Sequence, residues 1–306
     1  MSNYNIVCLG EVLWDILPDR ELPGGAPMNV AYHLQQLSQQ VAMVSRVGAD
    51  DHGERLLREM ERKGLSTACI QQDSAHPTGR VYARMDTHND MQYDIVYDVA
   101  WDHIAWQASL EKLLGSEGLQ YMVYGSLLAR HPVSRAALQQ ALRAGVQQVL
   151  DINLRAPYYS RDTLEWLMGS CHLLKLNLAE LELISAWYGS QASHEACIRM
   201  LADRFDIDTV LVTLGSKGCI GYIQEQFYYQ PGQPVEVADT IGSGDAFLAG
   251  FLACRINGCT PSYSLAYANA LGALVASRPG GCPDYDPLEI TAMIKERQTT
   301  LPGFDQ

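Results

Sequence analysis

The chain has 306 residues, of which 47% are hydrophobic and 19% are charged, and its formal net charge is −13 at pH 7. This length suits one large α/β domain or two smaller ones, and an acidic chain without a basic stripe is a poor partner for nucleic acid. The first residues do not resemble a signal peptide, because Glu11, Asp15 and Pro18 interrupt the apolar run. Since no stretch is long and apolar enough to span a bilayer, the sequence predicts a cytoplasmic protein with no membrane partner.

Short apolar runs and amphipathic stretches alternate along the chain. The apolar runs are rich in β-forming residues and end in Gly, Asn or a similar breaker, which predicts buried strands at 5–10, 41–48, 121–125, 148–153, 172–177 and 209–215. Helical periodicity, often closed by Gly, predicts helices at 52–63, 132–144, 178–188 and 193–205. This alternation predicts a parallel sheet that is covered by helices on both faces.

One segment has a different pattern. Residues 78–98, TGRVYARMDTHNDMQYDIVYD, alternate with period two around the turn-like THND. This pattern predicts an antiparallel, half-exposed hairpin. The sequence leaves open whether it is an ordinary surface hairpin or a flap over a site.

The C-terminal part contains two helices in series. The first is predicted over 244–257, and the second opens with Thr260 as N-cap and Pro261 at the first helical position, ending before Pro279. The stretch DTIGSGDAF (239–247) therefore lies at a helix N-terminus, where unpaired N–H groups and the helix dipole bind anions. A carboxylate beside such a site is useful if it accepts the proton of a hydroxyl that attacks a phosphate, as in phosphoryl transfer. Small residues before an Asp also occur as plain N-caps, so this stretch alone leaves both interpretations open.

Several other sites are excluded by the sequence. There is no GxxxxGK[ST] motif, and GSGDAF has Phe247 where a dinucleotide fingerprint needs Gly. The eight cysteines include no CxxC pair, and no histidine is spaced to complete a zinc site with Cys254 and Cys259. We therefore expect reduced, buried thiols.

Five motifs, in order along the chain, resemble those of the ribokinase-like (PfkB) carbohydrate kinases. They are GGAPMNVA (24–31), GADDHG (48–53), NLAE (177–180), TLGSKG (213–218) and DTIGSGDAF (239–247). The resemblance implies an α/β ribokinase-like fold: a central, mostly parallel sheet flanked by helices, with a small β lid. The whole chain, 1–306, would be a single kinase domain, with the lid formed by segments at about 11–26 and 78–102.

The resemblance also implies catalytic roles. Asp245 would be the catalytic base, and the amides of Gly242, Ser243, Gly244 and Asp245 would form the anion hole. The cofactors would be ATP and Mg²⁺, with Glu180 holding Mg²⁺ through water, which suits a hard cation that retains its waters.

The same resemblance assigns the binding residues. Asp15, Gly25 and Asn29 would bind the sugar, together with Asn153 and Arg155 of the DINLR stretch and Asp245 itself. ATP would contact Asn177, Thr213, Gly215, Lys217, Gly218, Gly242, Gly244 and Asn269. A monovalent cation such as K⁺ would be held by Asp239, Ile241, Val275, Arg278 and Gly280. K⁺ activation stays open, because Asp284 stands where other members often carry Ser.

The leading hypothesis is a fructokinase-like enzyme that phosphorylates fructose with ATP. The alternatives are a 2-keto-3-deoxygluconate or other sugar-acid kinase, in which Arg155 binds the substrate carboxylate, a ribokinase, and a non-catalytic sugar-binding regulator. Selection of the sugar by the lid would involve residues among Tyr82, Tyr93, Tyr97 and Trp101. Lids of this type can pair between subunits, so a homodimer through the lid is left open.

Overall fold

One large sheet runs through the molecule. The computed structural model describes residues 4–85, 91–189 and 192–300, and for 83–85, 91–93 and 296–300 it describes the backbone alone. The strands of this sheet are β1 (Ile6–Leu9), β4 (Val41–Gly48), β5 (Ile70–Asp73), β8 (Tyr121–Gly125), β9 (Gln147–Asp151), β10 (Leu173–Asn177), β11 (Thr209–Thr213), β12 (Gly218–Ile223) and β13 (Gln226–Pro231). Their order across the sheet is β13-β12-β11-β10-β9-β8-β1-β4-β5.

Neighbouring strands from β5 to β11 pair in parallel, whereas β12 and β13 add an antiparallel hairpin at one edge. All six predicted strands are present. The predicted strand at 148–153 ends at Asp151, and β5, β12 and β13 had not been predicted. The predicted α/β class with a mostly parallel sheet is confirmed.

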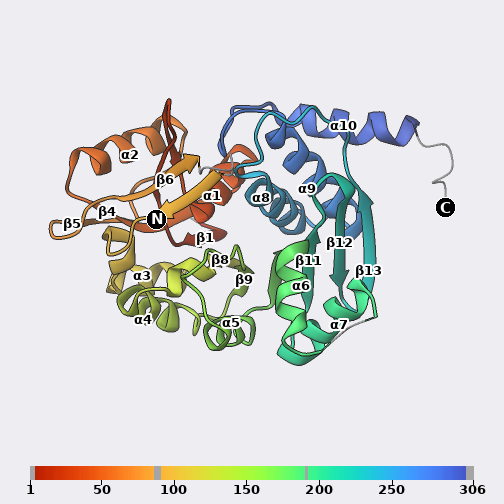
Figure 1. The fold of residues 1–306 in the computed structure, drawn as a ribbon, viewed down its shortest axis with the longest axis horizontal. Helices are drawn as coiled ribbons and strands as arrows, with labels where there is room; N and C mark the ends of the chain where they lie inside the picture. Colours follow the sequence, from red (N-terminus) through yellow and green to blue (C-terminus); the bar gives the residue numbers. More distant parts are fainter. Residues whose placement is uncertain (1–3, 86–90, 190–191, 301–306) are drawn as a thin grey trace.

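Helices cover both faces of this sheet (Figure 1). One face carries α1 (Ala26–Gln36), α2 (Asp51–Arg62), α8 (Ser243–Ile256) and α9 (Pro261–Ala276). The other carries α3 (Ala108–Leu114), α4 (Pro132–Ala141), α5 (Arg161–Met168), α6 (Leu178–Ala186) and α7 (His194–Phe205). The last helix, α10 (Pro287–Thr300), packs on α9, and three short 3-10 turns are η1 (Ala100–His103), η2 (Ser126–Ala129) and η3 (Gly215–Lys217).

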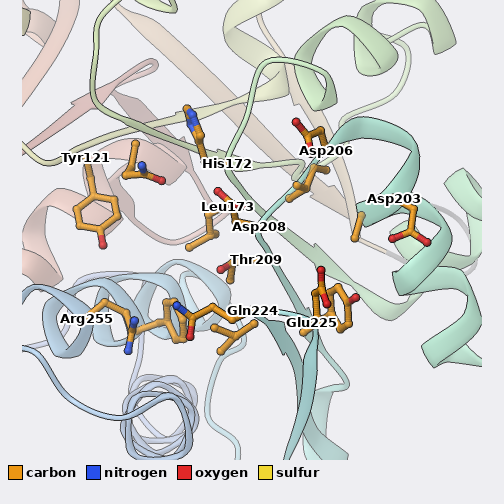
Figure 2. A pocket seen from close by; sticks show the side chains of 16 residues that line it. Tyr121, His172, Leu173, Asp203, Asp206, Asp208, Thr209, Gln224, Glu225 and Arg255 are labelled. Atoms are coloured by element: carbon orange, nitrogen blue, oxygen red, sulfur yellow. The ribbon is translucent and has the colours of Figure 1, made fainter.

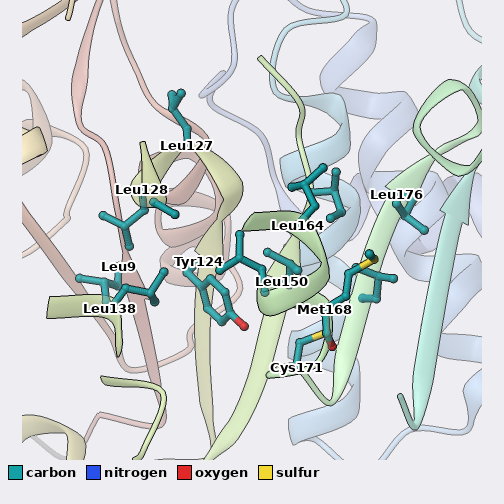
Figure 3. Close-up of a cluster of buried hydrophobic side chains, with 14 of the residues drawn as sticks. Leu9, Tyr124, Leu127, Leu128, Leu138, Leu150, Leu164, Met168, Cys171 and Leu176 are labelled. Carbon is teal, nitrogen blue, oxygen red and sulfur yellow. The ribbon is translucent and has the colours of Figure 1, made fainter. Parts of the chain in front are cut away.

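The strands are apolar on both sides because both faces are buried. In β1, Val7 and Leu9 face one core, whereas Ile6 and Cys8 face the other. Figure 3 shows part of the first core, where Tyr124 and Leu150 of adjacent strands meet leucines of α4 and α5. This two-sided burial explains the near-continuous apolar runs in the sequence.

A second, four-stranded sheet has the order β3-β2-β6-β7. Its strands are β2 (Leu13–Ile16), β3 (Glu21–Gly24), β6 (Gly79–Met85) and β7 (Met91–Ile95). The β6–β7 pair is antiparallel, as the period-two pattern of 78–98 predicts, and the predicted THND turn lies outside the described residues. We call this sheet the lid sheet, since both segments expected to form the lid contribute to it.

Local capping signals explain where the helices begin. The Thr260 hydroxyl caps α9 and Pro261 opens it, as predicted. The Asp50 carboxylate accepts the Gly53 N–H at 2.7 Å and caps α2. All eight cysteines are free thiols, and within the described residues no helix is long and apolar enough to cross a membrane.

Candidate active site

The N-terminus of α8 lies at the carboxyl ends of the parallel strands, where open α/β sheets bind their ligands. Gly242 is its N-cap and has φ +72°, which glycine adopts without strain. A Cβ at Gly242 would lie 2.5 Å from the Gly281 Cα, and one at Gly244 would lie 2.9 Å from the Lys175 Nζ. The small residues of this turn are therefore needed because backbone and an ammonium approach it closely.

Asp245 lies in the first turn of α8 and is buried. The amide Nδ2 of Asn29, from α1, donates a hydrogen bond to its Oδ2 at 2.8 Å. Burial, reinforced by repulsion from Asp151, raises the pKa of Asp245 to about 6, although Lys175 and the Asn29 hydrogen bond act in the opposite direction. At neutral pH this carboxylate is ionised but is a stronger base than an ordinary aspartate.

A buried ion pair lies next to Asp245. The Lys175 Nζ is 2.9 Å from Asp151 Oδ2, and both side chains are almost inaccessible to solvent. Burial acts to lower the pKa of Lys175, but the nearby carboxylates of Asp151, Asp245 and Glu180 raise it overall. Lys175 therefore stays charged and offsets the acidic groups around it.

The sequence analysis missed Lys175 and Asp151 as site residues, although a signal was present. Each is a charged residue inside an apolar strand, in HLLKLN and QVLDIN, and the two positions pair in register across β9 and β10. A charge buried in a parallel strand is costly unless it is paired, so the two charges predict each other.

The residues expected to bind sugar meet in one cavity of about 520 Å³. They come from loops and elements distant in the chain, and the cavity is lined by Asp15, Gly25, Asn29, Asn153, Arg155 and Asp245 among others. Asn153 and Arg155 lie in the loop after β9 rather than on an extended strand end, and Asn153 has φ +39°. Burial raises the pKa of Asp15 to about 6, and Arg155 lowers it.

Glu11 also lines this cavity and was not predicted as a site residue. Its Oε1 accepts the Ala26 N–H at 3.2 Å, whereas Oε2 is buried without a hydrogen-bond partner. Burial raises the pKa of Glu11 to about 7. An unsatisfied buried carboxyl oxygen is costly and points to a hydrogen-bond donor on a ligand.

A second cavity of about 380 Å³ adjoins the first at Thr213, Thr240, Ser243 and Gly244. It is lined by Gly215, Gly218 and Asn269, three of the predicted nucleotide-binding residues, and Asn177 lines the first cavity. Lys217 is exposed and lines neither cavity. The two cavities therefore meet at the N-terminus of α8, where one ligand can face another.

Glu180, the predicted Mg²⁺ residue, is buried at the start of α6. Its Oε1 accepts the Leu154 N–H and its Oε2 accepts the Asn177 N–H, each at 2.8 Å, so that it completes a capping box. Burial, reinforced by repulsion from Asp151, raises its pKa. A carboxylate oxygen that already accepts one hydrogen bond retains further acceptor capacity, so Glu180 suits a water-mediated contact to a hard cation.

The predicted cation loop is held together by Asp239. Its carboxylate accepts the Ile241 N–H at 3.0 Å and the Gly280 N–H at 3.1 Å, and so joins the two loop segments. Val275 is a core residue, and the Arg278 guanidinium binds the Asp284 carbonyl and the Glu289 carboxylate. The structure thus brings these segments together, while the Arg278 side chain points to other partners.

The aromatic residues proposed to select the sugar do not line the cavity in the described part of the chain, where Val81 and Ile95 represent β6 and β7. Trp101 is fully buried and stacks 3.9 Å beneath the Arg130 guanidinium, so it is a core residue. Tyr97 is half exposed, and the Tyr93 side chain lies outside the described residues.

Another hollow, of about 650 Å³, lies at the other end of the parallel strands, where their amino ends are (Figure 2). It is lined by loops at the amino ends of β10 and β11 and by Arg255 of α8. Its acidic residues Asp203, Asp206 and Asp208 are exposed. None of the predicted site residues lines it.

Comparison with known proteins reveals close relatives. Residues 19–287 match the pfkB family of carbohydrate kinases. A fructokinase of Klebsiella pneumoniae is 30% identical over 297 residues, which covers 91% of this chain and 95% of the relative. A fructokinase of Salmonella typhimurium is 25% identical with the same coverage.

Solved structures have the same fold. A fructokinase with bound ATP from Xylella fastidiosa has a TM-score of 0.84 at 23% identity, covering 97% of this chain and all of that structure. A ribokinase II structure from Escherichia coli has a TM-score of 0.84 at 21% identity, covering 96% of this chain and 99% of that one. At these identities the likeness establishes the ribokinase-like fold alone.

Proposed function

The chain belongs to the pfkB family of carbohydrate kinases and is a sugar kinase, and we propose that it phosphorylates fructose with ATP. The observation that carries the mechanism is the position of Asp245, buried at a helix N-terminus where two cavities meet. The choice of fructose is supported by the fructokinase relatives at 25–30% identity and by the DINLR stretch.

In this proposal Asp245 is the general base. Asn29 holds its Oδ2, which leaves Oδ1 to accept the proton of the attacking sugar hydroxyl. The hydroxyl oxygen forms a bond to the γ-phosphorus, the bond from that phosphorus to the ADP oxygen breaks in line, and ADP leaves. The transition state is loose, so positioning and charge neutralisation contribute more than proton removal.

The backbone amides of Gly242 to Asp245 would stabilise the negative charge of the transferred group, aided by the α8 dipole. Lys175 is well suited to assist, because its ammonium lies beside Gly244 and stays charged. Preorganised donors of this kind need no rearrangement during the reaction, which is why they are effective in a buried site.

The sugar would lie in the larger of the two adjoining cavities. Asp15 would accept hydrogen bonds from two hydroxyls, and Arg155, Asn153, Gly25 and Asn29 would complete the contact. The lid sheet would cover this cavity and exclude water, which protects ATP from hydrolysis. Residues 1–306 would act as a single domain in the cytoplasm, and a homodimer through the lid stays open.

The nucleotide would lie in the adjoining cavity, against Thr213, Gly215, Gly218 and Asn269. Its phosphates would extend toward Asn177 in the first cavity, and the exposed Lys217 would have to reach them from outside both cavities. Mg²⁺ would neutralise charge on the phosphate oxygens when bound, and Glu180 would hold it through water. The loop joined by Asp239 would carry K⁺ if the enzyme is potassium-activated.

The test is ADP release with Mg²⁺-ATP across a panel of fructose, ribose, 2-keto-3-deoxygluconate, nucleosides and fructose 6-phosphate, each with Na⁺ or K⁺. We expect fructose to be the strongest substrate, and the Asp245→Ala variant to bind sugar but lose nearly all turnover. A stronger signal with the sugar acid, abolished by Arg155→Lys, would replace fructose in the proposal. Sugar binding without any ADP release would overturn the catalytic assignment.

A further inference from the structure

A cluster of histidines lies where the lid sheet joins the body of the molecule. His76 lies three residues before β6, Asp98 three residues after β7, and His103 ends η1. His131, the N-cap of α4, lies beside them. None of these residues belongs to the cavities described above.

Two imidazole nitrogens converge on one carboxylate oxygen. The Nε2 of His103 donates a hydrogen bond to Asp98 Oδ1 at 2.8 Å, so a metal would have to displace this proton, and the Nε2 of His76 is 4.0 Å from the same oxygen. The two rings stack with centroids 3.6 Å apart, and one ligand atom from each of the three residues lies within 4.8 Å of the others. The group is partly exposed, so an ion can reach it from solvent.

His76 is already oriented as a metal ligand. Its Nδ1 is 3.1 Å from Asp73 Oδ2, and an ionised carboxylate accepts hydrogen bonds only, so Nδ1 carries the proton and Nε2 keeps its lone pair. Asp73 is buried and is held by the Arg46 guanidinium at 2.8 Å. A carboxylate behind the distal nitrogen is the usual outer support of a metal-bound histidine.

His131 does not share this arrangement, although its Nε2 is also 4.0 Å from Asp98 Oδ1. Its Nδ1 accepts the Val133 N–H at 3.3 Å, which places the proton of the neutral ring on Nε2. In His103 the Nε2 proton can move to Nδ1, which makes no hydrogen bond among the described residues, and so free the Nε2 lone pair. In His131 the same move would break the bond from the Val133 N–H. His131 is therefore a neighbour of the cluster rather than a ligand.

We propose that His76 Nε2, His103 Nε2 and Asp98 Oδ1 bind one divalent transition-metal cation of the Zn²⁺ or Ni²⁺ class. Two imidazoles and one carboxylate suit these metals, and a fourth position is left for water. Mg²⁺ is disfavoured because it prefers oxygen ligands. At Zn–ligand distances of about 2.0–2.2 Å the ligand atoms must move closer together, and Asp98, with a side chain 56% exposed, is free to make this movement.

The site has a mechanical consequence for the lid sheet. One ligand precedes β6 and two follow β7, so a bound cation would cross-link the two connections through which this hairpin meets the body. This inference does not depend on which sugar the enzyme phosphorylates.

The test is calorimetric titration of the tag-free, chelator-treated full-length chain with ZnCl₂ in the presence of millimolar Mg²⁺. We expect one saturable site per chain, and at least about tenfold weaker binding in His76→Asn and in His103→Asn. Asp73→Asn should weaken binding by roughly 10–100-fold by releasing the His76 ring. His131→Asn is the matched control, because asparagine is a good N-cap and should preserve the start of α4. This variant should bind Zn²⁺ as the wild type does.

The proposal is overturned if the wild type shows no saturable Zn²⁺ binding, or if His76→Asn and His103→Asn bind as tightly as it does. Equal loss of binding in His131→Asn and His103→Asn would also overturn the ligand set. Circular dichroism of each variant separates lost binding from lost folding. Because His76 and His103 lie on different segments, either variant alone carries the test if the other fails to fold.

Discussion

Two hollows lie at opposite ends of the parallel strands, one at their carboxyl ends and one at their amino ends, and both are lined by carboxylates. The hollow at the amino ends of the strands is the larger, about 650 Å³ against 520 Å³. Its acids, such as Asp203 and Asp208, are exposed, whereas Asp151 and Asp245 at the carboxyl ends are buried around Lys175. Volume therefore does not identify the reactive site.

The two sets of carboxylates differ in the free energy that their desolvation requires. Exposed carboxylates are solvated and need no partner, so their presence in a loop changes the stability of the fold little. Buried carboxylates are kept only where a lysine, an amide or a helix N-terminus offsets their desolvation, and such arrangements concentrate at functional sites. Substitutions at the two edges should accordingly differ greatly in effect.

The largest expected effect is that of Lys175→Met. Removing the ammonium leaves Asp151 as an unpaired buried charge, so the free energy of unfolding should fall by about 3–5 kcal/mol. Urea denaturation followed by circular dichroism measures this loss. Lys217→Met is the control, because Lys217 is exposed and should change stability by less than about 0.5 kcal/mol. A loss below about 1 kcal/mol in Lys175→Met would mean that the pair is not effectively desolvated.

Gly242→Ala should come next, with a fall in kcat of about 100-fold. Its Cβ would lie 2.5 Å from the Gly281 Cα. Gly281 lies close to Asn29, since a Cβ built on it would be 2.9 Å from the Asn29 Nδ2, so the clash should displace the partner of Asp245. Gly258→Ala is the matched control. Gly258 has nearly the same φ, +74° against +72°, but a Cβ there meets nothing within 4 Å.

Both glycine variants should lose about 1–2 kcal/mol of stability from the left-handed backbone. Only Gly242→Ala should lose turnover, measured as steady-state ADP release. If both variants lose activity equally, backbone strain rather than the close approach to Gly281 determines the effect.

The pH dependence of kcat/KM is a smaller effect. Asp245 must be ionised to accept a proton, and burial raises its pKa to about 6, so kcat/KM should fall about tenfold for each pH unit below 6 and level off above it. Asp15 (about 6) and Glu11 (about 7) lie in the same cavity, so the observed pKa belongs to the group as a whole.

Asn29→Ala sharpens this test, because the Asn29 hydrogen bond lowers the pKa of Asp245. Its loss should shift the acid limb toward higher pH. An acid limb near pH 4 in the wild type, as for an ordinary aspartate, would contradict a buried base.

Much of the fold and of the candidate site could be predicted from the sequence, because the signals for them are local. Apolar runs located the six central strands, and Thr260-Pro261 located the start of α9. The DTIGSGDAF stretch located the N-terminus of α8, since glycines and a helical pattern are adjacent there. Motifs such as NLAE and TLGSKG follow parallel strands, so they lie together at the carboxyl ends of the sheet.

What sequence reasoning missed depends on contacts between distant segments. Glu11 interrupts the apolar N-terminal run, but nothing local assigns it to a site, and only the fold brings it into the cavity. Lys175 and Asp151 look like isolated polar interruptions until their strands pair in register. Trp101 was a candidate for sugar contact as an aromatic residue of the expected lid segment, yet its packing under Arg130 makes it a core residue.

The smallest expected effect is at the amino-end hollow. In the double variant Asp203→Asn/Asp208→Asn both side chains are exposed, so stability should change by less than about 0.5 kcal/mol, and turnover should stay within about twofold. Asp151→Asn is its counterpart at the other edge: it makes the same chemical change, but leaves the buried Lys175 ammonium without its partner. Steady-state kinetics and urea denaturation of both variants compare the two edges directly. A tenfold loss of turnover in the double variant would mean that the larger hollow is coupled to the reaction from a distance, since none of its described lining residues lines either of the two adjoining cavities. Equal tolerance at both edges would mean that Lys175 does not need a charged partner, and the contrast between buried and solvated acids would lose its basis.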